Sequence, residues 1–177
     1  MSRFFFKENP ELFLGNPAEP KQKSYDWIIS ADKIFSSEIE GFTDSARIYH
    51  INFMIYKSFL FEESKAAESS ICAKDVHIYM GSGCHCAMLE GRMAKAVIIP
   101  CITVQKISNI NKTTTVLEKK EFKQCVIRSF GVQDDVIAFS FRYRTFSDQY
   151  NNYNSKGVQT GNAAVQMDFV KWEIQES

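Results

Sequence analysis

The sequence has few of the residues that mark loop-rich or fibrous proteins. Its 177 residues include eight glycines and four prolines, which excludes collagen-like and low-complexity chains. Neither sign of charge is in surplus, since 21 Lys and Arg balance 21 Asp and Glu, so the whole chain has no electrostatic preference for nucleic acid or an anionic membrane. No apolar run approaches the ~20 residues of a membrane-spanning helix. What remains is one globular domain, with 45% of its residues hydrophobic.

The sequence contains five cysteines: Cys72, Cys84, Cys86, Cys101 and Cys125. An odd number in a chain of this length does not indicate a disulfide framework, so reduced thiols are expected. The start of the chain has only three consecutive apolar residues, at 4–6, before a charge. A signal peptide needs an apolar core of ~7–15 residues, so we expect the chain to fold in the cytoplasm.

Residues 1–25 hold three of the four prolines, which predicts an N-terminal arm without regular structure. Residues 26–177 are predicted to form a β-rich domain. Alternating apolar and polar side chains indicate strands at 27–29, 37–41, 46–56, 75–79, 96–106, 114–121, 122–130, 136–146 and 164–175.

Two stretches interrupt the strands. Residues 57–74 predict an exposed excursion with one helical turn at 62–68. Residues 149–162, rich in Asn, Ser, Gly and Tyr, predict a long loop or a disordered tip. The clearest strand, at 46–56, lies directly before the excursion and is predicted to be unusually long.

One helix is predicted, at residues 81–95. Ser82 can cap its start, and Cys86, Leu89 and Met93 form a stripe on one face, whereas Gly91 favours an early end. Many strands and a single helix, without repeating βαβ units, predict a mainly β protein. The expected fold is a tight antiparallel β-barrel or two-sheet sandwich with one flanking α-helix.

The predicted helix start, Gly81-Ser82-Gly83-Cys84-His85-Cys86, is the cluster that most resembles a metal or phosphate site. Cys84, His85 and Cys86 are ligand types that suit zinc. However, side chains two positions apart on a helix point ~200° apart, and no second ligand pair follows. A dinucleotide loop would need a third glycine where Cys86 stands. We expect buried small thiols on a helix, with no metal or cofactor.

Other candidate catalytic groups also have simpler interpretations. A cysteine nucleophile would need His50, His77 or His85 beside a thiol, and the first two fall in predicted strands. The acidic pairs Glu62-Glu63 and Asp134-Asp135 fall in predicted loops, where solvated charge is expected. The sequence therefore contains no recognisable catalytic motif.

Lys119, Lys120 and Lys123 surround Phe122 in a pattern that could suggest a nucleic-acid face. Interleaved glutamates cancel their field. An exposed strand pair is expected instead.

Four segments, taken in order, follow the pattern of a known family. Ile39-Glu40-Gly41 leads into the long strand, and the excursion at 57–74 follows it. Residues 76–80 form a strand before the helix and its glycine, and residues 165–174 form a closing strand of the sequence Val-Gln-Met-Asp-Phe-Val-Lys-Trp-Glu-Ile. Over residues 27–175 this order resembles the haemolysin-coregulated protein (Hcp) family, which forms the inner tube of the bacterial type VI secretion system and is related to phage tail-tube proteins.

The resemblance implies a non-enzymatic subunit without cofactors, six copies of which close into a ring, with rings that stack into a tube. It implies further copies of the chain, the sheath and spike proteins of the apparatus, and effector proteins in the lumen as partners. Nucleic-acid binding and membrane insertion are not implied. Such a protein is cytoplasmic and is then secreted without a signal peptide. The excursion, with Phe59, Leu60 and Phe61, would contact a neighbouring subunit.

Two other functions are compatible with the sequence. A monomeric bacterial β-barrel binding module would take a small ligand or a protein partner in a cavity of ~300–1,000 Å³. An enzyme of unrecognised class, or an effector that acts in a host, would need converging polar groups. The native mass separates the ring from the binding module.

Overall fold

The computed structural model describes residues 26–36, 39, 41–57, 61, 62, 65, 66, 71–110, 113–154, 156–169 and 173–176. The N-terminal arm predicted at 1–25, which is distinct from the hairpin described below, lies outside these residues. The elements in chain order are β1 (Asp26–Ser30), β2 (Ser45–Asn52), β3 (Ile55–Lys57), β4 (Phe61–Glu62), β5 (Lys65–Ala66), β6 (Ile71–Ala73), β7 (Val76–Gly81), α1 (His85–Ala94), β8 (Ile99–Ile110), β9 (Thr113–Gln133), β10 (Val136–Arg142), β11 (Thr145–Tyr153), β12 (Gln159–Asp168) and β13 (Glu173–Glu176).

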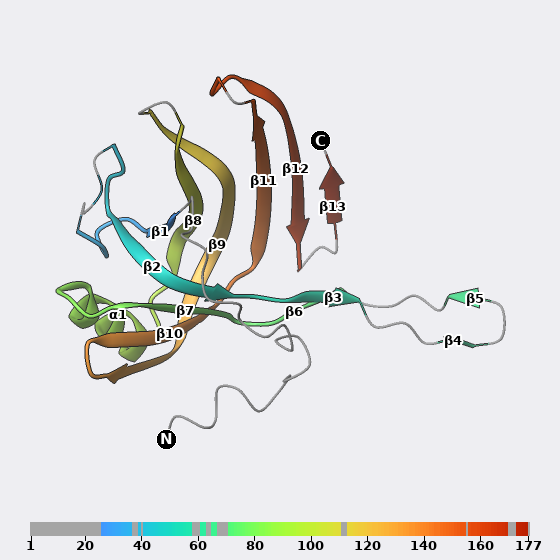
Figure 1. Cartoon of the computed structure of the whole chain (residues 1–177). Helices are drawn as coiled ribbons and strands as arrows, with labels where there is room; N and C mark the ends of the chain where they lie inside the picture. Colours follow the sequence, from blue (N-terminus) through green and yellow to red (C-terminus); the bar gives the residue numbers. More distant parts are fainter. Residues whose placement is uncertain are drawn as a thin grey trace.

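Six strands close into an antiparallel barrel. Their order is β10-β7-β2-β1-β8-β9, and β9 pairs back onto β10. Closure depends on the 21 residues of β9, because the first half of this strand pairs with β8 and the second half with β10. The predicted mainly β fold, an antiparallel barrel with one flanking helix, is confirmed (Figure 1).

Three more strands extend the sheet beyond β9, and we call them the wing. β11 pairs with the first half of β9, β12 with β11, and β13 with β12. Figure 1 shows the wing standing beside the barrel. Along one edge of β9 the pairing strand changes from β11 to β10 near Gln124, whose φ of 53° bends the strand. On the facing segment, Tyr143 and Arg144 separate β10 from β11.

The excursion predicted at 57–74 contains an extended hairpin, which we call the arm. β3 pairs with β6, and β4 pairs with β5, so the arm projects to one side of the barrel (Figure 1). The helical turn predicted at 62–68 is wrong, because Glu62 pairs with Lys65 in this ladder.

The single long strand predicted at 46–56 is two strands, β2 and β3, which belong to different sheets. A bulge between Ile48 and His50 shifts the register of β2 against β7. The bulge turns Tyr49 and His50 outward in succession, so that Ile48 is buried and Ile51, three residues later, also packs on the core. Strict alternation would have placed these two isoleucines on opposite faces.

The strand predicted at 37–41 lies partly outside the described residues. Ile39 forms an isolated bridge with Phe42, and Gly41, at φ 86°, makes the turn predicted there.

Several predicted strand boundaries are also wrong. Residues 114–121 and 122–130 form one continuous β9, whereas 136–146 is divided between β10 and β11. Residues 149–162, predicted as a loop, include most of the β11–β12 hairpin, and 164–175 spans parts of both β12 and β13. The β11–β12 hairpin escaped detection because its polar strands bury little apolar surface, and its ladder hydrogen bonds do not depend on side-chain type. The start predicted for β8, at residue 96, is also early by three residues, because residue 96 still belongs to the turn after α1.

The helix α1 is shorter at its start than predicted. Cys84, not Ser82, is its first flanking residue, and no side chain caps it. The helix passes through Gly91 and ends where Ala96, at φ 49°, adopts the left-handed conformation. Two hydrogen bonds close this end, from Ala96 N to Met93 O and from Val97 N to Arg92 O, both at 3.0 Å. They form the Schellman pattern that glycine usually completes.

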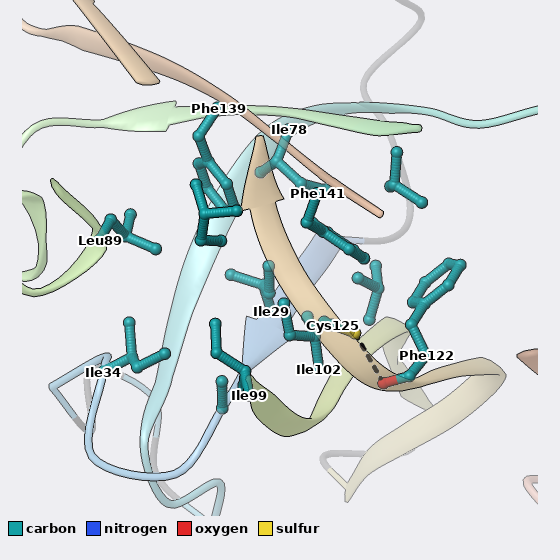
Figure 2. Close-up of a cluster of buried hydrophobic side chains, with 14 of the residues drawn as sticks. Ile29, Ile34, Ile78, Leu89, Ile99, Ile102, Phe122, Cys125, Phe139 and Phe141 are labelled. Carbon is teal, nitrogen blue, oxygen red and sulfur yellow. Dashed lines mark hydrogen bonds between the residues drawn. The ribbon is translucent and has the colours of Figure 1, made fainter. Parts of the chain in front are cut away.

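A continuous apolar core fills the barrel and reaches the wing. Leu89 of α1 and Ile34 of the β1–β2 connection join Ile29, Ile78 and Phe139 in it, as Figure 2 shows. The predicted helix stripe is confirmed, since Leu89 is buried and its two companions pack partly against the core.

Phe122 lies where the barrel core meets the wing. Its ring centroid is 4.9 Å from that of Tyr143, 5.1 Å from Phe146 and 5.3 Å from Phe141. Its carbonyl accepts a hydrogen bond from Cys125 Sγ at 3.1 Å (Figure 2). Burial of such aromatic surface is the main stabilising contribution expected in this region.

Candidate functional site

The residues predicted to contact a neighbouring subunit belong to the arm. Phe59 and Leu60 lie outside the described residues, while Phe61 begins β4, where its backbone pairs with Ala66. The base of the arm is fixed to the barrel, because Ile55 of β3 packs on the core and Lys74 N donates to Met54 O at 2.9 Å. The contact itself stays a prediction.

The predicted metal-like cluster before and within α1 has a different arrangement from the one expected. Cys84 is exposed and Cys86 is half-buried, so the expectation of buried thiols is wrong. The buried member is His85, 3% exposed, whose Nε2 lies 3.0 Å from Gly81 O and whose ring faces Phe35 at 5.6 Å. Gly83 lies against this ring, since a Cβ there would be 3.0 Å from His85 Cε1. The cluster packs the start of the helix onto the barrel.

The lysine-rich stretch of β9 is not the exposed strand pair that was predicted. Phe122 is fully buried, and Lys120, 4% exposed, is the one buried lysine among the residues whose burial the structure describes. Lys119 remains at the surface, 2.6 Å from Glu121. The direction of each side chain follows from alternation along β9, because residues 120 and 122 point into the protein and residues 119 and 121 point outward.

Lys120 lies between two carboxylates. Its Nζ donates to Asp148 Oδ2 at 2.5 Å and contacts Glu118 Oε1. Lys120 and Asp148 are direct partners in the β9–β11 ladder, so the backbone sets their separation. Both carboxylates are shielded from water, with side-chain exposures of 7% for Asp148 and 12% for Glu118. We call these three residues the charged cluster.

Aromatic rings enclose the charged cluster. Lys120 Nζ lies 4.9 Å from the ring centroid of Phe53 and 5.3 Å from that of Tyr150. Burial alone would lower the pKa of Lys120, but hydrogen bonds to Asp148 and Glu118 hold it above its ordinary value. Burial raises the pKa of the Asp148 carboxyl, against the opposing effect of Lys120. The lysine is therefore held as a cation in surroundings that disfavour a bare charge.

The sequence analysis did not find the charged cluster. The available signal was the alternation around Phe122, which places Lys120 on the buried face of β9. Its partner Asp148 lies two residues beyond the strand predicted to end at residue 146, so the pairing of β9 with β11 at Asp148 was not predicted.

Exposed apolar side chains are spread over the surface instead of gathered on one element. Those with the largest exposed fractions are Ile98, Tyr49, Val158 and Val132, at 62%, 61%, 58% and 57%. The wing differs from the barrel, because β12 has no fully buried residue anywhere along its length. Its two faces are both accessible for contacts with other molecules.

The part of the chain that the structure describes contains neither a cluster of metal-ligating side chains nor a helix that could span a membrane. No three His, Cys, Asp or Glu side chains there are grouped so as to hold an ion, and α1 is too short and polar to cross a membrane.

Comparison with known proteins gives a fold but no close relative. No protein-family model matches the sequence, and no curated protein matches it. Among solved structures, a type six secretion system protein is similar at TM-score 0.75 and 11% identity, over 85% of this chain and 99% of the other. Hcp1 from Salmonella typhimurium is similar at TM-score 0.68 and 13% identity, over 86% and 100% of the two chains. The secreted protein Hcp3 from Pseudomonas aeruginosa is similar at TM-score 0.53 and 11% identity, over 86% and 97%.

These likenesses extend over almost the full length of the other chains. At 11–13% identity they establish architecture rather than activity. The resemblance found in the sequence is confirmed at this level, and the chain has the fold of the Hcp proteins.

Proposed function

We propose that this chain is a structural subunit of a type VI secretion inner tube, in which six copies close into a ring and rings stack. The observation that carries the proposal is the match to all of Hcp1 from Salmonella typhimurium by 86% of this chain. On this proposal the subunit catalyses no reaction and meets the sheath, the spike and effector proteins in the lumen. It folds in the cytoplasm and is later expelled.

The form of the subunit supports a ring. A closed ring is built from head-to-tail contacts, so each subunit needs two different surfaces that fit one another. Two projections leave the barrel: the wing, which extends the sheet beyond β9, and the arm, which follows on from the neighbouring strands β2 and β7. The wing strand β12 is accessible on both faces, which suits a sheet that a neighbouring subunit covers.

The arm supplies a second, more specific proposal. Phe59, Leu60 and Phe61 would contact a neighbouring copy, because Phe61 begins β4 in the projecting hairpin and three successive apolar residues in the sequence favour an interaction surface. Phe59→Asp is expected to abolish rings and leave the barrel folded by circular dichroism. Phe59→Leu, which keeps an apolar side chain, should still form rings. A Phe59→Asp protein that remains hexameric would exclude this contact.

The experiment that tests the main proposal is a native mass by size-exclusion chromatography with light scattering, under reducing conditions. A ring gives about six times the 20.3 kDa of one chain and an annulus by negative-stain microscopy. A monomer at every accessible concentration would contradict the proposal and favour a monomeric binding module, which a ligand screen would then examine.

A further inference from the structure

The charged cluster combines three features that ordinary surface ion pairs lack. Lys120 Nζ is 2.5 Å from Asp148 Oδ2, the two residues face one another in a backbone ladder, and Glu118 contacts the same ammonium. An amine, a carboxyl group and a second carboxylate are therefore held together by two paired strands. Such fixed proximity replaces a bimolecular encounter with an intramolecular one.

The surroundings favour a neutral product over the ion pair. Lys120 and Asp148 are 4% and 5% exposed, and the ring centroids of Phe53 and Tyr150 lie 4.9 and 5.3 Å from the ammonium nitrogen. Charges withdrawn from water in this way lose hydration free energy, which their attraction offsets only in part. An amide joining the same two side chains carries no net charge and avoids that cost.

We propose that Lys120 and Asp148 condense into an intramolecular isopeptide bond that links β9 to β11. The bond forms between Lys120 Nζ and Asp148 Cγ, and one Cγ–O bond of the carboxyl group breaks. An ammonium and a carboxylate become an amide and one water molecule. Charge and atoms balance without an oxidant, a nucleotide or any other co-reactant.

Glu118 has the position of the proton carrier. One proton passes from the ammonium to Asp148, giving a neutral amine and a neutral acid. Burial, which raises the pKa of Asp148, favours that acid, whereas the hydrogen bonds that raise the pKa of Lys120 oppose the transfer, so the neutral pair is a minor, reactive form of the ion pair. As the amine attacks, Glu118 takes a second proton from Nζ and delivers it to the departing oxygen, which leaves as water. Glu118 ends as it began and can accept a hydrogen bond from the new amide.

The same strand provides a matched comparison. Lys119 Nζ lies 2.6 Å from Glu121 Oε1, but these side chains are 37% and 28% exposed. Water solvates both charges there and no third carboxylate contacts the ammonium in the described structure. This pair should remain an ordinary ion pair.

The intact mass of the purified full-length chain tests the proposal directly. The linked protein weighs about 18 Da less than its sequence, the mass of one water molecule. Trypsin then fails to cut after Lys120 and yields residues 120–123 joined to residues 145–156. Lys120→Arg and Glu118→Gln should each show the full mass of their own sequences, while Lys119→Arg keeps the deficit.

The outcomes are decisive even if a variant fails to fold, because the unaltered protein gives the main result. A full sequence mass after prolonged incubation at neutral pH, with cleavage after Lys120 and a free peptide of residues 145–156, overturns the bond. A deficit that persists in Lys120→Arg places the link elsewhere and also overturns it. Neither result depends on whether the chain forms rings.

Discussion

Truncation of Phe122 to alanine tests whether the ring cluster between the barrel and the wing is a main source of stability. Phe122 is fully buried, and three ring centroids lie within 4.9–5.3 Å of its own. Loss of a buried phenylalanine side chain costs about 3–5 kcal/mol through lost transfer free energy and the cavity left behind. That range already includes lost ring contacts, and the three ring pairs of Phe122, each worth roughly 0.5–1.5 kcal/mol, place this site at its upper end. We therefore expect the free energy of unfolding to fall by about 5 kcal/mol, a large part of a total of ~5–15 kcal/mol.

The assay is urea unfolding at 25 °C followed by circular dichroism, with all variants at one protein concentration because assembly raises apparent stability. Phe122→Leu keeps most of the apolar volume and should lose less than about 1.5 kcal/mol. Val132→Ala changes an exposed position on the same strand and should stay within about 0.5 kcal/mol. A loss below about 2 kcal/mol for Phe122→Ala would refute the reasoning, because the site would then be shown to collapse without cost.

Three further results are expected. Ala96→Gly should stabilise the protein by about 1 kcal/mol, seen as a rise of roughly 2–4 °C in Tm. Glycine has no Cβ and so adopts the positive φ at the end of α1 without steric strain. An unchanged or lower Tm would contradict this explanation. Gly83→Ala should destabilise it by about 1–3 kcal/mol in the same assay, since the new Cβ would press on the buried His85 ring at 3.0 Å; a neutral effect would mean that the ring moves freely. In the native protein at pH 8, a thiol reagent should label exposed Cys84 quickly and leave Cys125 unmodified until urea is added. Cys125 is protected because burial raises the pKa of its thiol to about 12. Equal labelling rates for the two thiols would contradict the burial of Cys125.

The sequence alone predicted the class of fold because its strongest signals were local. Alternation in β10, for example, places Ile137, Phe139 and Phe141 on one face, and all three are buried. The predicted strand boundaries were wrong where pairing between distant segments determines where a strand ends. Residues 121 and 122 offer no turn residue, so β9 continues through them, while Tyr143 and Arg144 break a run that alternation alone would have continued.

The charged cluster could be predicted only in part. Period-two alternation from Phe122 indicates that Lys120 faces inward, but a buried lysine is rare enough that the interleaved charges favoured an exposed interpretation. The compensating carboxylate comes from Asp148, 28 residues away. That pairing is fixed by the register of β11 on β9, which depends on long-range packing that no short stretch of sequence encodes.

The closure of the barrel has a consequence for the chain as it leaves the ribosome. β1 completes its pairing only with β8, in which Ile107 stands opposite Asp26, and the circuit closes only when β10 has been made. At ~5–20 residues per second, β1 waits roughly 4–15 s for β8 during synthesis. Ile28 and Ile29, fully buried in the finished protein, are exposed throughout that interval. The nascent chain should therefore be a substrate for ribosome-associated chaperones, and slower translation should lengthen the period in which it can aggregate.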